Sequence, residues 1–307
     1  MLTPPKLHIT SIGEVLWDIV GDEKHLGGAP FNFAAHCQQL GTCSTIISRV
    51  GTDRLGDEIL ERAAALGLDY SLIQRDLDHP SGQVQVSLGS DGQPSYDIQS
   101  GAAYDYLQAP PEAIARMAAS DVICFGTLAQ RAATAKESIH SLLKSATNAL
   151  IVCDLNLRPP HYTAQTVQES ITICDVLKLN EDELRNVQNM LGPHNLDRDD
   201  FALHLLNNYG IELLCVTRGA QGCYLRTVDE RVDAPGYRCQ VKDTIGSGDA
   251  FTAALITQYT AGNLLAATAD FANLVGAYVA TQSGAVPPIS ADRLEIFAMH
   301  ARPNSRE

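Results

Sequence analysis

Two glycines and an aspartate near the end of the sequence have the spacing of an anion-binding loop. Gly246 and Gly248 lie in the run DTIGSGD (243–249), directly before a long helical pattern. Glycines permit a tight loop whose backbone N–H groups point one way, and the helix start adds its positive end there. Asp249, in the first turn, could accept a proton from an attacking hydroxyl group. An ordinary turn with an aspartate cap would have the same pattern, so the local sequence leaves both interpretations open.

A second pair of glycines stands at the start of another predicted helix. Gly27 and Gly28 would let the backbone approach a ligand closely. Asn32 follows on the first turn, and its amide can both donate to and accept from a hydroxyl group. Such a partner suits a polyol, although a solvent-facing asparagine would give the same sequence.

Short apolar strands alternate with helices along most of the chain, and these elements would position both motifs. The expected strands lie at residues 7–12, 45–48, 121–125, 150–154, 176–179 and 212–217. The expected helices lie at residues 31–40, 57–66, 111–119, 132–145, 165–173, 181–190, 201–208, 248–259 and 264–281, the last two closing the chain. Because short apolar strands bounded by helices are typical of parallel sheets, we expect an α/β fold with helices on both faces.

Other extended segments do not fit this alternation. Residues 15–26 and 83–98 could form a small separate sheet, with Asp91-Gly92 as the hairpin turn of the second segment. Residues 223–226 and 231–241 have the pattern of antiparallel strands.

Composition excludes several classes of protein. The 22 basic and 36 acidic residues give a net charge of −14, which argues against nucleic acid or a membrane surface as the main partner. No apolar run reaches the ~18 residues of a membrane-spanning helix, and the N-terminus lacks the pattern of a signal peptide. The eight scattered cysteines form no zinc motif, so we expect a reduced, cytoplasmic protein. There is no P-loop, and no GxGxxG follows the first strand.

Together the two glycine motifs resemble those of the ribokinase-like (PfkB) carbohydrate kinases. GGAPFNFA (27–34) is similar to the family element GG-x-x-x-N-x-A, and DTIGSGD to D-T-x-G-x-G-D, in the family's order and separation. GEVLWD (13–18) resembles the opening strand, NEDE (180–183) the N-x-x-E element and TRGAQG (217–222) the nucleotide-binding turn. Ser247 departs from the usual alanine but keeps the backbone N–H.

The resemblance covers nearly the whole chain and implies a single domain over residues 1–307. Its fold would be Rossmann-like, with a central mostly parallel sheet flanked by helices and a small β-sheet lid formed by roughly residues 15–26 and 83–98. In several family members, lid edges pair into a dimer, so a homodimer through the lid is a further expectation.

The resemblance also assigns roles. Asp249 would be the catalytic base, and the backbone of Gly246, Ser247 and Gly248 would hold the developing negative charge. Asp18, Gly28 and Asn32 would bind the sugar hydroxyl groups. The residues expected near the nucleotide are Asn180, Glu183, Thr217, Gly219, Gly222 and Asn273.

The resemblance also bears on two cations, Mg²⁺ and K⁺. Asn180 and Glu183 would position hydrated Mg²⁺ beside the phosphates of ATP, with Glu183 acting through water. A K⁺ site, with Asp243 and the Ile245 carbonyl as ligands, stays open.

The sugar is less clear. DLNLRP (154–159) is similar to the D-x-N-x-R stretch of fructokinases and of 2-keto-3-deoxygluconate kinases, and GE-x-L-x-D favours a fructokinase. Arg158 would bind the substrate carboxylate in the second group; in the first it would meet phosphate or Asp154, or form a structural ion pair. We therefore expect ATP-dependent phosphorylation of a ketohexose, most simply fructose. Open alternatives are a keto-deoxy acid kinase, another sugar or nucleoside kinase with Trp17 or Phe31 stacked on the base, and a catalytically idle sugar-binding sensor.

Overall fold

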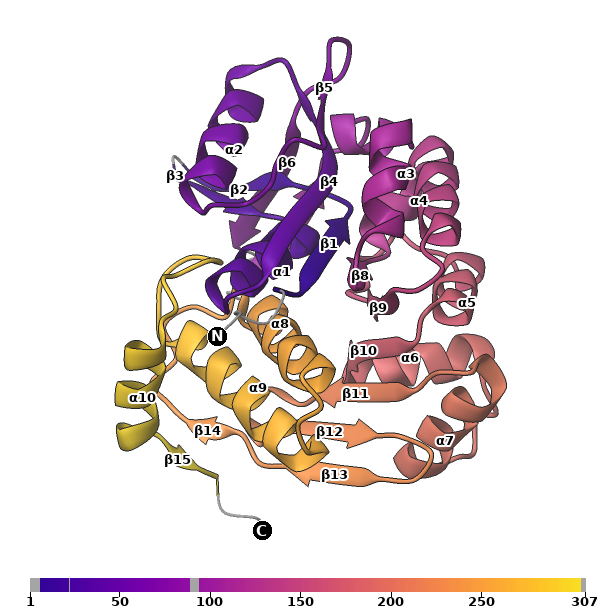
Figure 1. Cartoon of the computed structure of the whole chain (residues 1–307), viewed down its shortest axis with the longest axis vertical. Helices are drawn as coiled ribbons and strands as arrows, with labels where there is room; N and C mark the ends of the chain where they lie inside the picture. Colours follow the sequence, from indigo (N-terminus) through magenta and orange to yellow (C-terminus); the bar gives the residue numbers. More distant parts are fainter. Residues whose placement is uncertain (1–5, 22, 89–93, 305–307) are drawn as a thin grey trace.

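The computed structural model describes residues 6–21, 23–88 and 94–304 (Figure 1). Its central sheet has nine strands in the order β13-β12-β11-β10-β9-β8-β1-β4-β5. Their bounds are β1 His8–Ile12, β4 Cys43–Gly51, β5 Ile73–Asp76, β8 Val122–Phe125, β9 Leu150–Asp154, β10 Val176–Asn180, β11 Leu213–Thr217, β12 Cys223–Arg226 and β13 Arg231–Ala234. All neighbours are parallel except β11–β12 and β12–β13, so the expected mostly parallel α/β sheet is confirmed.

Helices cover both faces of this sheet. They are α1 Ala29–Gln39, α2 Arg54–Ala65, α3 Pro111–Ala118, α4 Ala133–Ser145, α5 Ala164–Ile173, α6 Glu181–Leu191, α7 Arg198–Tyr209, α8 Ser247–Thr260, α9 Leu265–Ala280 and α10 Ala291–His300. The short helices are η1 Ala103–Tyr106, η2 Leu128–Arg131 and η3 Gly219–Gln221. The apolar side chains of α1, α8 and α9 pack on one face, and those of α3 to α7 pack on the other. Strands such as β8 (VICF) are therefore buried on both faces, as their continuous apolar sequences require.

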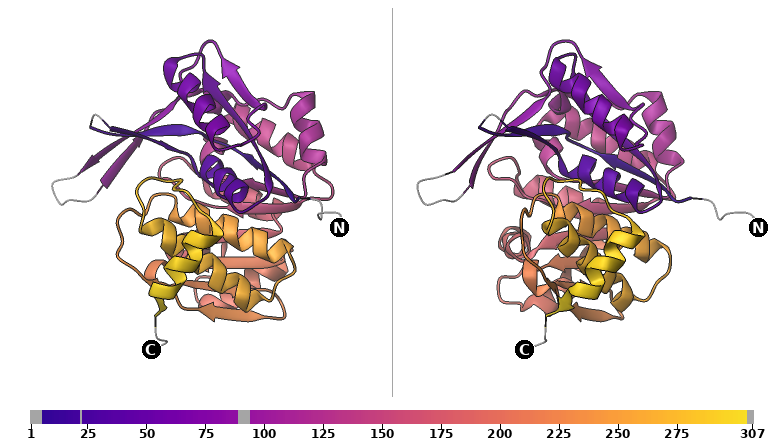
Figure 2. Two further views of the ribbon diagram at one scale, coloured as in Figure 1. Left: turned by 60° about the vertical axis from the view of Figure 1, so that its left-hand side comes forward. Right: turned by 90° about the vertical axis from the view of Figure 1, so that its left-hand side faces the viewer.

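A second sheet projects from the body beside the carboxyl ends of the central strands (Figure 2). Its strands are β2 Leu16–Val20, β3 Glu23–Gly27, β6 Gly82–Leu88 and β7 Pro94–Ile98, in the order β3-β2-β6-β7. The small separate sheet expected from the extended segments is thus present; that it closes as a lid stays a prediction. The expected turn at Asp91-Gly92 lies outside the described residues.

Some elements differ from expectation near the C-terminus. The helix α10 follows the two predicted closing helices. Within the segment 231–241, only β13 joins the central sheet; β14 (Tyr237–Arg238) pairs instead with β15 (Arg302–Pro303). Residues 302–303 are too few to give a strand pattern, so this pairing was not predictable. None of the helices within the described ranges is long and apolar enough to cross a membrane.

Candidate active site

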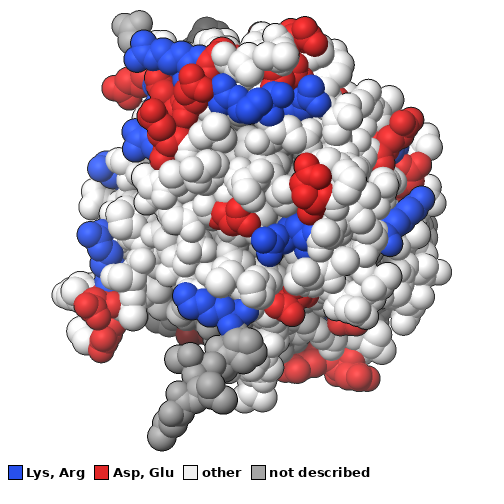
Figure 3. All heavy atoms as spheres, turned by 45° about the horizontal axis from the view of Figure 1, so that its top comes forward, with Lys and Arg blue, Asp and Glu red and all other residues white. Residues whose placement is uncertain are grey.

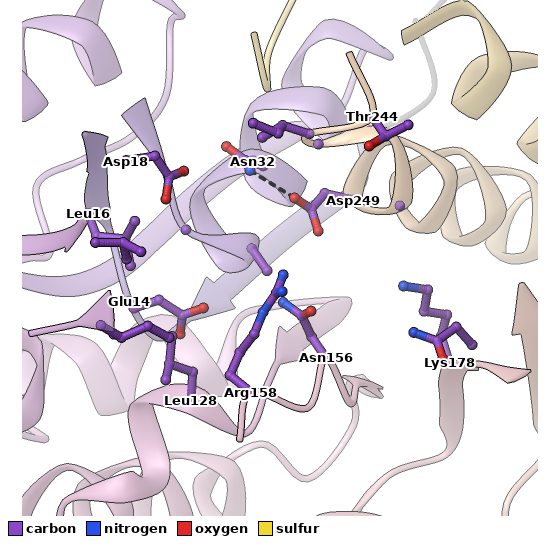
Figure 4. A pocket seen from close by; sticks show the side chains of 18 of the residues that line it. Glu14, Leu16, Asp18, Asn32, Leu128, Asn156, Arg158, Lys178, Thr244 and Asp249 are labelled. Atoms are coloured by element: carbon purple, nitrogen blue, oxygen red, sulfur yellow. Dashed lines mark hydrogen bonds between the residues drawn. The ribbon is translucent and has the colours of Figure 1, made fainter. Parts of the chain in front are cut away.

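A cavity of about 380 Å³ lies between the carboxyl ends of the central strands and the second sheet. Parallel sheets bind ligands outside these ends, at the point where the strand order reverses. Here that point lies between β1 and β8. Figure 4 shows Glu14, Asp18, Asn32, Arg158 and Asp249 around one space, so residues far apart in the sequence meet.

The glycine loop before α8 forms one end of the cavity. Gly246 has a φ of 76°, and a Cβ on it would lie 2.1 Å from the Ala285 carbonyl oxygen. The first N–H groups of a helix have no partner inside it, and their positive end here adjoins the cavity. Ser247 differs from the other predicted amides, because its N–H donates to the Thr244 carbonyl oxygen at 3.2 Å.

Asp249 has the surroundings that a general base needs. The Asn32 side chain donates from Nδ2 to Asp249 Oδ2 at 2.8 Å, which ties α1 to α8. Burial raises the pKa of Asp249 to about 6, and the charge of Asp154 adds to this; Asn32 and Lys178 act in the opposite direction. Such a carboxylate is ionised at neutral pH but basic enough to accept a proton.

The remaining predicted sugar residues lie on the other side of the same cavity. Gly28 has a φ of 106°, and a Cβ there would lie 2.5 Å from the Glu14 carbonyl oxygen. Burial raises the pKa of Asp18, whereas Arg158 and His25 lower it. Arg158 acts electrostatically on Asp18, Glu14 and Asp249 alike, so one guanidinium serves three carboxyl groups.

The two aromatic residues considered for base stacking are elsewhere. Trp17 and Phe31 are 3% and 0% exposed, within a core cluster that includes α2. The cavity wall has no aromatic side chain among the described residues.

Asn180 and Glu183 form the start of α6. Asn180 Oδ1 accepts from the Glu183 N–H at 2.9 Å, and Glu183 Oε2 accepts from the Asn180 N–H at 2.8 Å. The other oxygen of Glu183 accepts from the Leu157 N–H at 2.7 Å. Asn180 also lines the cavity. Glu183 thus has a structural function as a helix cap, and its role toward Mg²⁺ through water stays a prediction.

Asp243 joins two loops next to the glycine motif. Its carboxylate accepts from the Ile245 N–H and from the Gly284 N–H, both at 3.0 Å. The groups named for a K⁺ site are therefore neighbours. Among the described residues, no three His, Cys, Asp or Glu side chains gather as they would for a metal held directly by protein.

A second cavity, of about 500 Å³, adjoins the first. It is lined by four of the six residues expected near the nucleotide, together with Ser247: Thr217, Gly219, Gly222 and Asn273. The two cavities share Thr217, Thr244 and Gly248. Two ligands could therefore meet at the N-terminus of α8, beside Asp249.

The pfkB family carbohydrate kinase model matches residues 9–292. The chain belongs to the pfkB family of carbohydrate kinases. The two cavities that meet at the glycine loop are therefore the candidate sites for the two substrates of a carbohydrate kinase.

Named relatives of this pfkB kinase include fructokinases. It is 28% identical to a fructokinase of Escherichia coli over 284 residues, covering 85% of this chain and 87% of the relative. A crystal structure of an uncharacterized sugar kinase from Pyrococcus horikoshii superposes with a TM-score of 0.79 at 28% identity, covering 91% and 93% of the two chains. The fold also matches that of a Xylella fastidiosa fructokinase solved with bound ATP (TM-score 0.83, 23% identity, 95% and 98% covered).

Sequence reasoning missed two residues that line the two cavities. Lys178, in the middle of the apolar strand β10, donates from Nζ to Asp154 Oδ1 at 3.0 Å and lies next to Gly248. Burial alone would lower the pKa of Lys178, but Asp154 and Glu183 outweigh it and raise that pKa. The signal was available, because a lysine inside a buried strand needs a partner. Asn304 lines the second cavity and donates from its N–H to the Gly236 carbonyl oxygen at 2.7 Å. No sequence pattern around Asn304 indicates this position.

Replacing Lys178 by methionine should reduce turnover of the kinase by about 10²–10³-fold, because a charge beside the glycine loop is lost. It should also lower the free energy of unfolding by about 3–5 kcal/mol, because Asp154 stays buried without its partner. Steady-state kinetics and urea unfolding would measure the two effects.

Two further variants separate charge from fold. Lys178→Met combined with Asp154→Leu should regain stability without regaining turnover. Lys144→Met, on the exposed face of α4, should change neither. Normal turnover in the single variant at position 178 would contradict a role for the ammonium group.

Proposed function

We propose that the chain transfers the γ-phosphoryl group of ATP to a hydroxyl group of a ketohexose, with fructose as the first candidate. The observation that carries this proposal is the junction of the two cavities at Gly248, with Asp249 beside it. A sugar in the first cavity and ATP in the second would bring the acceptor hydroxyl and the γ-phosphorus together there.

Each group then has a task. Asp18, Gly28 and Asn32 hold the sugar, and Asp249 takes the proton of the attacking hydroxyl group. The start of α8 and Lys178 stabilise the negative charge on the transferred group. Asn180, Thr217, Gly219, Gly222 and Asn273 position the nucleotide. Mg²⁺, when bound, would neutralise phosphate charge; with few protein carboxylates at hand, it would be held chiefly by phosphate oxygens and water, as this ion tolerates.

The surroundings of Arg158 favour a neutral sugar over a keto-deoxy acid. Asp18 and Asp249 already interact with this guanidinium, so a substrate carboxylate would compete with them. The names of fructokinase relatives point the same way. The absence of a described aromatic side chain in the cavity wall disfavours a nucleoside.

The test is ATP consumption with Mg²⁺ and K⁺ against fructose, ribose, 2-keto-3-deoxygluconate, adenosine and fructose 6-phosphate. We expect fast turnover on fructose only. Preference for the keto-deoxy acid would make Arg158 the carboxylate partner and overturn the ketohexose assignment. No turnover on any acceptor, together with sugar binding, would favour a sensor.

A further inference from the structure

Glu14 has no role in the reaction just described, although it lies inside the sugar cavity. It lies two residues after the carboxyl end of β1 and is 2% exposed. Its carboxyl group points toward Arg158, in the space that Asp18 and Asp249 also face (Figure 4).

The carboxyl group of Glu14 is only partly satisfied. The backbone N–H groups of Glu14 and Ala29 act on it. Oε2, however, is buried and has no hydrogen-bond partner among the described residues. Buried carboxyl oxygens nearly always have a partner in folded proteins, so an atom left without one inside a ligand cavity indicates that the ligand supplies it.

The polar groups behind Glu14 do not fill this need. Tyr104 Oη and Arg131 Nη1 are also buried without a partner. Arg131 is fixed by Asp105, whose Oδ1 accepts from Nε at 2.7 Å, and its guanidinium lies 5.0 Å from the Tyr104 ring centre. Both groups respond to the charge of Glu14, but neither forms a hydrogen bond with its Oε2. Oε2 of Glu14 is therefore available to form a hydrogen bond with a ligand in the cavity.

We propose that Glu14 is a substrate-binding residue whose Oε2 forms a hydrogen bond with a hydroxyl group of the sugar. This inference rests on the proposed function, because it takes the cavity to be the sugar site. It adds an assigned contact on the β1 side, opposite Asn32 and Asp249.

The protonated acid is the form that binds. Sugar hydroxyl groups both donate and accept hydrogen bonds, and Asp18 and Asp249 already offer acceptors for their O–H groups. A carboxylic acid adds a donor for a sugar oxygen, which a carboxylate does not. Burial raises the pKa of Glu14 to about 7, Asp249 adds to this, and Arg158 opposes it. The charged and titratable groups around Glu14 are Asp249 on α8, Arg158 after β9, Tyr104 on η1 and Arg131 on η2, and Asp18 on β2 lines the same cavity.

Protonation of Glu14 makes binding of the sugar depend on pH. Below the pKa of the free protein, Glu14 carries its proton and the sugar binds without a proton cost. Above it, each binding event must take up a proton, so the dissociation constant rises toward tenfold per pH unit above pH ~7. The bound sugar also excludes water from Glu14. Because this disfavours the ionised form, it strengthens the same loss of affinity at higher pH.

The test is calorimetric titration of the sugar selected by the turnover panel, without ATP, from pH 5.5 to 8.5. Wild-type protein should bind more weakly above pH ~7. Glu14→Gln, which keeps a donor and never ionises, should bind with the low-pH affinity throughout. Glu14→Ala should bind at least ~10-fold more weakly at every pH. Glu61→Gln, on exposed α2, should follow wild type.

Two results would overturn the assignment: wild-type affinity in Glu14→Ala, or a wild-type pH slope in Glu14→Gln. If the alanine variant does not fold, the near-isosteric glutamine variant still tests the assignment through the pH dependence of its dissociation constant. KM for ATP should stay within ~2-fold in every variant, which a general loss of structure would not allow. Failure of the proposed function is distinguishable, since wild-type protein would then show no turnover of a ketohexose, whereas failure of the Glu14 assignment leaves that turnover in place.

Discussion

Asp249→Asn should turn over about 10²–10⁴-fold more slowly than wild type, the range expected when a general base is removed. Binding of sugar and ATP should persist, because the amide oxygen of asparagine can still accept the hydrogen bond from Asn32 that now measures 2.8 Å. Steady-state kinetics together with calorimetric titration of both ligands would establish this combination.

The same aspartate should set the acid limb of the activity. Its raised pKa of about 6 in the ligand-free protein means that the base is protonated below that pH, so kcat/KM should fall as pH drops through about 6. Stability should move in the other direction. Because the folded-state pKa lies above that of the unfolded chain, ionisation of Asp249 costs stability as pH rises through about 6. Asparagine should remove that pH-dependent loss.

Asp229→Asn, an exposed change in a turn, is the matched control and should leave both properties unaltered. A near-normal rate in Asp249→Asn would show that another group accepts the proton of the attacking hydroxyl group. Lost ligand binding in that variant would show instead that Asp249 holds the cavity together.

The second large effect is expected at Gly246. An alanine there would adopt a left-handed conformation that costs about 1–2 kcal/mol, and its Cβ would start 2.1 Å from the Ala285 carbonyl oxygen. The loop must shift, which displaces the amides at the start of α8. Loss of such donors lowers rates by about 10²–10³-fold, and this is the expected fall in kcat.

Gly262 offers a close comparison, because it has a φ of 74° but no atom within 4 Å of an added Cβ. Gly262→Ala should therefore lose about 1 kcal/mol of stability and keep its turnover. Thermal unfolding and initial rates of both variants separate backbone strain from loop displacement. Equal turnover in the two variants would refute the role given to the Gly246 loop.

Most of the fold could be predicted from the sequence, because apolar strands such as β8 and β9 are short, continuous and flanked by helical patterns. The motif residues could also be predicted, since Gly246, Gly248 and Asp249 lie within four residues of one another at the start of α8. Chemistry that depends on neighbours across the sheet was harder to foresee. The partner of Lys178 is 24 residues away on another strand, and nothing in GEVLWD shows that Glu14 faces Asp249. The hydrogen bonds from the Leu157 N–H to Glu183 and from the Gly284 N–H to Asp243 likewise appear only once backbone amides have positions.

The order of the helices along the chain has a consequence for synthesis on the ribosome. α8 and α9 cover one face of the sheet, where Ile9, Val122 and Val152 belong to a core cluster with Phe251 and Val275. Translation reaches these helices only after residue 246, when every strand of the central sheet has been made. A nascent chain folding as it emerges would expose that apolar face until then, a state prone to aggregation. Co-translational binding of a chaperone should accordingly be strongest before α9 leaves the exit tunnel.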